Sequence, residues 1–296
     1  MDRRGHDAGG EERMTAARVS TPAAPAPIGS VRRAFNDGLV VAWRNLKRIP
    51  RIPELAIFAI LQSIMFVLLF AFVFGGAILI PGNPNPNAYR EYLMPGIFAQ
   101  TIVFAAATTA IGMCDDINKG IIDRFRSLPM ARSAVLTGRT SSDVVYNAGI
   151  LVVLMVTGFA VGWTNHNGFV ALLQGIALLL LFAFAMAWIG VWLGLSVPTV
   201  EVAQQVAFTV LFPITFVSSA FVPIRSMPDW LQPFAEWNPT STLSTSLRRL
   251  WGNPETNAPG SSLASTDPIL VTLIWVVVIL AIFGPLSVRR YRSMSR

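Results

Sequence analysis

The chain has 296 residues, of which 53% are hydrophobic and only 13% are charged, whereas an ordinary soluble domain carries about 25% charged residues. This balance excludes a soluble globular enzyme as the leading interpretation and excludes disorder over most of the chain. A single cysteine, Cys114, excludes an internal disulfide framework. The net charge of +7 is compatible with nucleic-acid binding, but the positions of the basic residues favour a membrane protein with no nucleic-acid partner.

Two segments precede the apolar part of the chain. Residues 1–29 are rich in Ala, Pro, Gly and Arg without apolar periodicity, which predicts a disordered cytoplasmic tail. Residues 30–54 predict a basic amphipathic helix, capped by Ser30, that lies in the plane of the membrane surface. This helix is expected to be a topology anchor or, alternatively, an interface helix that also contacts a cytoplasmic partner. Its apolar residues recur at helical spacing: Val31, Phe35, Leu39, Ala42, Trp43 and Leu46.

Six long apolar runs follow, and none of them contains Asp, Glu, Lys or Arg. About 20 apolar residues cross the hydrocarbon core as a helix, and backbone in lipid must satisfy its hydrogen bonds within the segment. The runs therefore predict an all-α membrane protein with six transmembrane helices within residues 55–288 and a cytoplasmic C-terminal tail, residues 289–296. The six runs are 55–80, 93–114, 144–163, 170–195, 202–222 and 269–288.

The basic residues predict the orientation. Ten Lys and Arg residues precede the first run, five lie between the second and third runs, and four lie in the tail. The opposite side carries only four. Because cytoplasmic loops carry the excess of Lys and Arg, both termini are expected in the cytoplasm.

The loop between the second and third runs, residues 115–143, carries an apolar stripe and predicts an amphipathic helix that ends at Pro129. A helix held between two spans can act as a lever, because a push on its cytoplasmic side moves both spans. The alternative is a solvated connector. The stripe consists of Ile117, Ile121, Ile122, Phe125 and Leu128.

The long segment 223–268 is expected outside the membrane. Trp230, Leu231, Phe234 and Trp237 share one helical face. This face predicts either an aromatic belt at the headgroup level or a gate over the outer mouth of a pathway. Residues 252–267, rich in Asn, Pro, Ser and Gly, predict an exposed loop.

Catalytic, metal-binding and nucleotide-binding motifs are not found in the sequence. The spans also lack the ionisable groups that ion-driven carriers usually need. Uphill transport would therefore take its energy from another chain. Neutral amides in the spans most often join helices, or alternatively line a pathway for an amphiphile: Gln62, Gln100, Asn147, Gln204 and Gln205.

Two stretches carry a resemblance to a known family. Residues 116–132, continuing to Gly138 and Arg139, resemble the cytoplasmic loop of type-2 ATP-binding-cassette (ABC) transporter permeases, in particular the daunorubicin-resistance branch. Residues 218–223, with the later pairs Met227-Pro228 and Asn238-Pro239, resemble that branch's segment after the fifth span. The resemblance covers about residues 35–290 and includes the six-span plan.

The resemblance implies two kinds of partner protein, a second permease subunit and an ATPase subunit. Such permeases pair as homodimers or heterodimers, and each docks a separate ATPase subunit that binds ATP and Mg, so no cofactor is expected in this chain. The loop would be the coupling helix that enters a cleft on the ATPase. The residues implied in coupling are Asp116, Gly120, Asp123, Arg124, Phe125, Arg126, Pro129 and Arg132, and those of the external gate are Phe221, Trp230, Phe234 and Trp237.

The sequence thus predicts the permease subunit of an ABC exporter that moves lipophilic drugs, polyketides or lipids outwards, and it predicts no enzymatic activity for this chain. The alternatives are an exporter of a cell-envelope lipid or polymer precursor, and a membrane anchor that binds an ATPase without transport. A membrane-embedded transferase is disfavoured, because the sequence has no cluster of His and acidic residues near an interface.

Overall fold

A computed structural model describes residues 61–62, 64–74, 88–120, 132–255 and 262–293. The predicted tail 1–29, the amphipathic helix 30–54, part of the first span and residues 121–131 of the coupling loop lie outside the described residues. Within the described ranges the regular elements are helices, with no strand, as expected for an all-α membrane protein.

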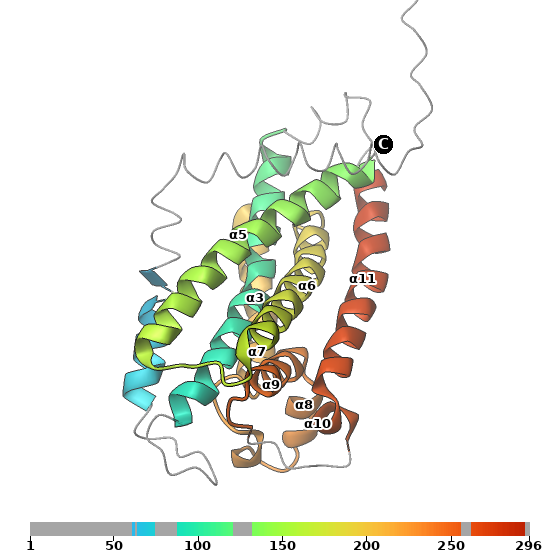
Figure 1. The fold of residues 1–296 in the computed structure, drawn as a ribbon. Coiled ribbons are helices and arrows are strands. Elements are labelled where there is room, and N and C mark those ends of the chain that lie inside the picture. The colour runs from blue at the N-terminus through green and yellow to red at the C-terminus, as the bar shows by residue number, and fades with distance from the viewer. Residues whose placement is uncertain (1–60, 63, 75–87, 121–131, 256–261, 294–296) are drawn as a thin grey trace, which may run out of the picture.

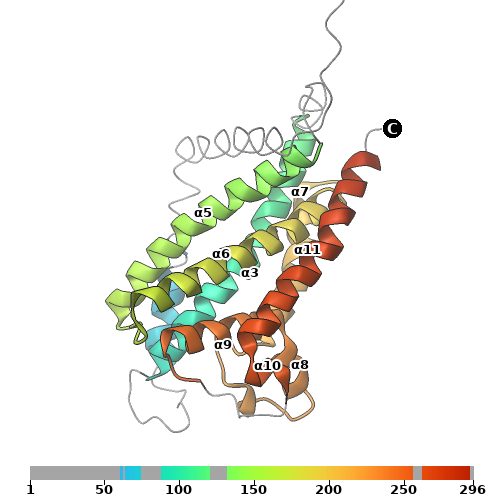
Figure 2. The same cartoon turned by 45° about the vertical axis from the view of Figure 1, so that its right-hand side comes forward.

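Five long helices form the body of the fold and run alternately up and down (Figures 1 and 2). The chain turns back at each connection, so successive helices are antiparallel. The C-terminus lies at the same end of the bundle as the end of the second and the start of the third predicted spans. We call this the basic end, because it carries Lys119, Arg139, Arg289, Arg290 and Arg292. The helices are α3 (Ala88–Asn118), α5 (Arg132–Val161), α6 (Gly168–Gly194), α7 (Val200–Phe216) and α11 (Pro268–Ser293).

Four of these helices, α3, α5, α6 and α11, are long and apolar enough to cross a membrane. Two shorter apolar helices, Ile64–Val73 and Val200–Phe216, occupy the predicted first and fifth spans. The first of them contains a π-helical stretch, η2 (Leu69–Phe74). The fold is therefore that of a multi-pass membrane protein.

The helix ends differ most from the apolar runs in α5 and α7. Helix α5 begins at Arg132, so residues 132–143, which were expected to belong to the loop, are continuous with the third span. Helix α7 ends at Phe216, not at Val222 as predicted. Pro213 lies inside its last turn and donates no backbone hydrogen bond, and the chain then passes through bends and turns to residue 222.

Helix α3 is the centre of the bundle. In its most apolar window 72% of the residues are buried, against 22% in α11, so α3 is surrounded by protein whereas α11 lies at the periphery. Its closest neighbour is α6, where a Cβ on Gly190 or Gly194 would collide with the backbone oxygen of Ala106 or Ala110. Small residues of this kind let two helix backbones approach closely in a membrane.

The end of the bundle opposite the basic end is closed by short elements, and we call it the α9 end. Helix α9 (Pro239–Trp251) is almost completely buried and packs against α3, α6 and α11. The prediction of an exposed loop over 252–267 is wrong at Asn253, Ala264 and Ser265, which are buried. Asn253 bonds to Trp163 and Thr164, and the Ser265 backbone oxygen accepts from Arg249 of α9. The remaining elements here are η3 (Ile224–Ser226), α8 (Gln232–Trp237) and α10 (Leu263–Thr266).

Candidate functional site

A buried ion cluster joins the two helices that flank residues 121–131. On α5, Arg139 Nη1 lies 2.5 Å from Asp116 Oδ2 of α3, and Arg139 Nε lies 3.3 Å from Asp143 Oδ1. Thr109 Oγ1 of α3 donates a hydrogen bond to Asp143 Oδ2 at 2.8 Å. All three charged side chains are mostly buried. The cluster therefore fixes the last turns of α3 to the first turns of α5.

Glycine provides the room for this cluster. A Cβ at Gly112 on α3 would collide with the Arg139 guanidinium. Breaking a buried ion pair by removing one partner leaves an uncompensated charge, which typically costs about 3–5 kcal/mol. The cluster consequently resists separation of α3 from α5.

Three of the eight predicted coupling residues lie in the described part of the chain. Asp116 lies in the ion cluster, with its side chain directed at Arg139. Gly120 is exposed just after α3, with φ of 66°, where glycine accommodates the left-handed turn. Arg132 begins α5. The others, Asp123, Arg124, Phe125, Arg126 and Pro129, lie outside the described residues, and the coupling role of the whole set stays a prediction.

The predicted pathway amides do not come together in this chain. Gln100 and Asn147 are buried, and Asn147 Nδ2 donates to the Asp143 backbone oxygen at 2.8 Å. Gln62, Gln204 and Gln205 are exposed on the outer surface of the bundle. Amides that are exposed in this way can line a pathway only if a second chain covers them.

Helix α7 has distinct faces at a spacing of four residues. One face is buried against the bundle and consists of Ala203, Ala207, Leu211 and Thr215. The opposite face is polar and exposed, and it carries Glu201, Gln205 and Thr209. Phe208, Phe212 and Phe216, which are also exposed, come three or seven residues after Gln205 and Thr209 and therefore form an aromatic stripe on the same side of the helix. The Thr209 hydroxyl donates to the Gln205 backbone oxygen at 2.7 Å and Glu201 lies in the first turn of α7, so the Gln205 amide is the group of this face that hydrocarbon would leave without a partner.

The predicted gate residues separate into two places. Phe221 is buried and stacks on Phe70 of η2, with ring centroids 4.6 Å apart, and it also contacts Phe66 and Phe216. The three aromatic residues near α8 are instead exposed, with Trp230 at 71% and Phe234 at 70% of full exposure. Phe221 thus links the first span to α7, whereas the α8 residues face outward.

The buried cation Arg248 was not predicted from the sequence. It lies on α9 and is 1% exposed. Its Nε donates to the Tyr92 backbone oxygen at 2.9 Å, and its Nη2 donates to the backbone oxygens of Ser219 and Ala220 at 2.7 and 3.3 Å. Its Nη1 reaches the hydroxyls of Ser219 and Ser244. Arg248 thereby donates hydrogen bonds to backbone carbonyls in the irregular segment after α7.

A signal for this buried helix exists in the sequence. Leu243, Leu247 and Trp251 recur at a spacing of four residues and are all buried. The Ser and Thr residues around them obscured the pattern, because hydroxyl residues are typical of loops. Burial lowers the pKa of the Arg248 guanidinium, although an arginine stays protonated in proteins.

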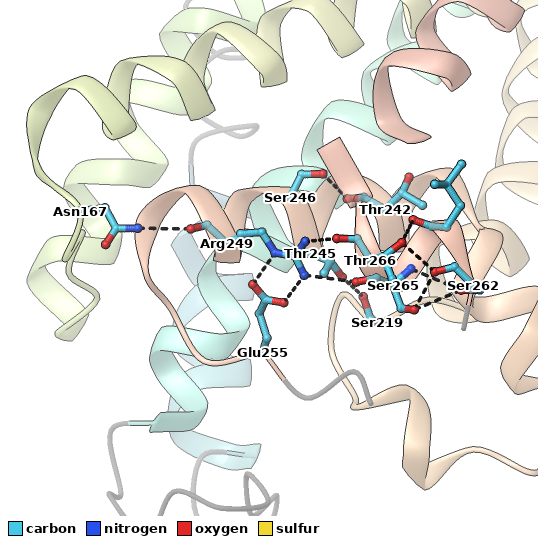
Figure 3. A network of polar contacts seen from close by, with 11 residues as sticks. Asn167, Ser219, Thr242, Thr245, Ser246, Arg249, Glu255, Ser262, Ser265 and Thr266 are labelled. Atoms are coloured by element: carbon cyan, nitrogen blue, oxygen red, sulfur yellow. Dashed lines mark hydrogen bonds and ion pairs between the residues drawn. The ribbon is translucent and has the colours of Figure 1, made fainter. Parts of the chain in front are cut away.

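A second polar network, at the surface, fixes α9 to its neighbours (Figure 3). Arg249 makes two hydrogen bonds to the Glu255 carboxylate, at 3.0 and 2.9 Å, and these raise the pKa of Arg249. Arg249 also donates to the backbone oxygens of Thr266 and Ser265 next to α11. At the end of α9, Asn167 Nδ2 donates to the backbone oxygens of Arg249 and Leu250. The network therefore holds α6, α9 and α10 together.

These features define a multi-pass helical membrane protein. Its polar clusters join one helix to another, and the described residues contain no cluster of potential metal ligands. Residues 38–250 match the ABC-2 type transporter family, and the chain belongs to this family, as its loop motifs predicted.

Three relatives illustrate the range of the family. The chain is 29% identical to the daunorubicin resistance ABC transporter permease protein DrrB1 of Streptomyces coeruleorubidus over 262 residues, and this aligned region covers 88% of each chain. It is 24% identical to the probable doxorubicin resistance ABC transporter permease protein DrrC of Mycobacterium tuberculosis, over 92% of this chain and 94% of the relative. It is 25% identical to the putative transport permease ycf38 of Cyanophora paradoxa, over 72% of this chain and 73% of the relative. The predicted daunorubicin-resistance branch is thereby confirmed.

Proposed function

We propose that this chain is the transmembrane subunit of an ATP-driven exporter that moves lipophilic compounds out across a bacterial plasma membrane. ATP and Mg would bind to a separate ATPase subunit. The membership of the ABC-2 family and the similarity to drug-resistance permeases support this proposal. Lipophilic drugs, polyketides or lipids are the cargo class that suits spans without charged residues.

The single observation that carries the proposal is the exposed polar face of α7. Glu201, Gln205 and Thr209 point away from the chain's own bundle. A polar group facing hydrocarbon without a partner costs free energy. A second permease subunit that covers this side of α7 would remove the cost, and the aromatic stripe that shares this side would contact an apolar cargo along the seam.

The ion cluster supplies the mechanical connection in this proposal. The ATPase would push on residues 121–131, and Arg139 would pass the displacement to α3 and α5 together. Because α7 packs on α3 through the buried face, a movement of α3 would reach α7. In this way nucleotide binding on the partner would open or close the seam between two subunits.

The proposed topology has six spans with both termini in the cytoplasm. Helix Ile64–Val73 would be part of the first span and α7 the fifth. The basic end would then be cytoplasmic, in agreement with the excess of Lys and Arg in cytoplasmic loops, and the α9 end would be external.

The test is reconstitution of the chain with its ATPase subunit in phospholipid vesicles. We expect ATP-dependent movement of daunorubicin and ATP hydrolysis that daunorubicin stimulates. Stimulation by a cell-envelope lipid precursor instead of daunorubicin would favour the second cargo class. Binding of the ATPase without stimulation by either compound would identify a membrane anchor and would contradict the proposal.

A further inference from the structure

Three arginines at the end of α11 have no anionic partner within the described part of the chain. Arg289, Arg290 and Arg292 are all exposed, and no carboxylate among the described residues forms an ion pair with any of them. At the same end of the bundle, Lys119 and Arg139 each have a carboxylate partner. Positive charge is therefore left without a counter-ion at one place, the end of α11.

One of these arginines is held in position by the protein. Arg290 Nε donates to the backbone oxygen of Leu195, the C-cap residue of α6, at 3.4 Å. About two turns earlier, Phe283 of α11 packs against Trp192 of α6, with ring centroids 5.5 Å apart. These contacts hold the end of α11 to the end of α6. The Nη1 and Nη2 atoms of Arg290 bond to none of the described residues, so they can donate to a ligand.

The same side of α11 is apolar one turn earlier. Ile282 and Leu286 are 49% and 38% exposed, and Leu286 precedes Arg289 and Arg290 by three and four residues. Residues at these spacings are neighbours on a helix surface, so the exposed apolar surface runs directly into the two guanidinium groups. Helix α11 lies at the periphery of the bundle (Figure 2), where this surface contacts lipid.

The length of α11 places its arginines at the level of lipid phosphate groups. No charged residue lies between Asp267, which is exposed, and Arg289. From Pro268 to Arg289 the helix advances 21 residues, which is about 32 Å at 1.5 Å per residue. The hydrocarbon core is about 30 Å thick. With Pro268 at one boundary of this core, Arg289 and Arg290 reach the headgroup region at the other.

We propose that the end of α11 binds an anionic phospholipid, with its phosphate at Arg289 and Arg290 and an acyl chain along Leu286 and Ile282. A guanidinium presents a fork of N–H donors that matches phosphate oxygens, and anionic headgroups attract basic residues beside a span. Arg292 adds a third positive charge. An acidic protein surface would match the charge alone, whereas a phospholipid matches both the charge and the apolar side chains next to it.

This lipid site lies outside the proposed export mechanism and does not depend on it. It needs no ATP, cargo or second subunit, and it is the same whichever way the chain crosses the membrane. The general excess of basic residues predicts only a side of the membrane, whereas the site at α11 predicts a preference for one class of lipid at one helix. Failure of the test below therefore leaves the proposed function unaffected.

The experiment compares an anionic and a zwitterionic phospholipid as quenchers at one position. Cys114 is the single cysteine of the chain, so Cys114→Ser gives a cysteine-free background. Ser293→Cys, exposed and one turn beyond Arg289, carries a fluorophore, and Ser226→Cys beside the exposed Arg225 at the α9 end is the matched control. The full chain is reconstituted without an ATPase in phosphatidylcholine vesicles. A small fraction of phosphatidylglycerol or of phosphatidylcholine carries a nitroxide near the headgroup.

We expect nitroxide phosphatidylglycerol to quench the label at 293 more strongly than nitroxide phosphatidylcholine, with equal quenching by the two lipids at 226. Arg289→Gln keeps the Arg290 bond to α6 and should lower the preference about fivefold, the contribution of one basic residue near an anionic surface. Arg289→Lys, which keeps the charge, should retain most of it. Gel filtration in detergent checks that each variant is folded before reconstitution.

The double variant, Arg289→Gln with Arg290→Gln, should lose nearly all of the preference. Equal quenching by the two lipids at 293 in the labelled parent chain would overturn the proposal, and so would a preference that persists in the double variant. Absence of quenching by either lipid would place the end of α11 away from the membrane surface, or under another protein chain, and would overturn it as well.

Discussion

The guanidinium of Arg248 lies over the ring of Tyr92, 3.6 Å from its centroid. The same Tyr92 accepts the Arg248 Nε hydrogen bond through its backbone oxygen, and its hydroxyl donates to the Ser219 backbone oxygen at 2.8 Å. Two residues from α3 and α9 thus hold the irregular segment that follows α7. Among the described residues no carboxylate forms an ion pair with Arg248, so neutral carbonyls and the tyrosine ring take the place of a counter-ion.

Replacement of Arg248 by methionine should destabilise the chain. The carbonyls of Tyr92 and Ala220 would lose the Arg248 donor, and the Ser219 carbonyl would keep only the Tyr92 hydroxyl; an unsatisfied buried polar group costs about 1–3 kcal/mol. Thermal unfolding in detergent measures the effect. Arg225→Met is the matched control, because Arg225 is exposed and surface substitutions usually change stability by less than about 0.5 kcal/mol. Equal melting temperatures for the two variants would contradict the role of Arg248.

The ion cluster at the basic end is expected to couple ATP hydrolysis to transport. Arg139→Met removes the cation shared by Asp116 and Asp143, at a cost of about 3–5 kcal/mol, and should reduce cargo-stimulated hydrolysis more than it reduces binding of the ATPase. Arg139→Lys, which keeps the charge without the forked geometry, should give an intermediate loss. If Arg139→Met retains full stimulation in reconstituted vesicles, the cluster does not transmit the movement.

The contact between α3 and α6 depends on glycine. Gly190→Ala should destabilise the fold by about 1–3 kcal/mol, because the new methyl group overpacks the contact with the Ala106 backbone oxygen. Gly149→Ala on α5, where a Cβ meets nothing within 4 Å, should be neutral or stabilising, since alanine favours a helix by about 0.8–1.0 kcal/mol over glycine. Chemical denaturation in detergent measures both variants, and a Gly190→Ala protein as stable as Gly149→Ala would refute the close packing.

The polar face of α7 should lie at the interface with a second subunit. In the Cys114→Ser background, Gln205→Cys should form a covalent dimer on mild oxidation in the membrane, whereas Ala203→Cys, which is buried against the bundle, should not. Electrophoresis without reductant separates the two outcomes. A monomer at both positions would place the second subunit elsewhere.

The orientation can be tested at two exposed serines. Ser226→Cys at the α9 end should react with a membrane-impermeant thiol reagent added to intact cells, and Ser293→Cys at the basic end should react only after permeabilisation. Both positions are exposed in the structure, so access to the reagent depends on the side of the membrane. The reverse pattern of labelling would invert the proposed topology.

Four of the predicted spans coincide with helices that are long and apolar enough to cross a membrane, because charged residues are costly in lipid and their absence leaves a strong pattern. That same criterion placed the start of the third span at Val144, directly after Asp143, although the helix begins at Arg132. A charge that is paired inside the protein does not end a helix, and a count of charges cannot detect the pairing. The pairing of Arg139 with Asp116 joins residues 23 positions apart, which no local pattern reveals.

Helix α9 was missed for a related reason. Its Ser and Thr residues are buried, but they bond to one another and to neighbouring helices, as Ser246 does with Thr272 at 3.1 Å. A segment rich in polar residues is exposed to solvent only when the protein offers no hydrogen-bond partners for its side chains. The predicted gate was separated into Phe221 and the α8 residues because the sequence gives spacing along one segment but not the turn between residues 217 and 231.

The close approach of α3 and α6 has a consequence for how the molecule can move. Where backbone meets backbone at Gly190 and Gly194, no layer of flexible side chains lies between the helices to absorb sliding. The two helices will therefore travel as one rigid block through any working cycle. Rearrangement is left to the elements around that block, among them α7, which packs on α3 through one face and leaves its other sides exposed.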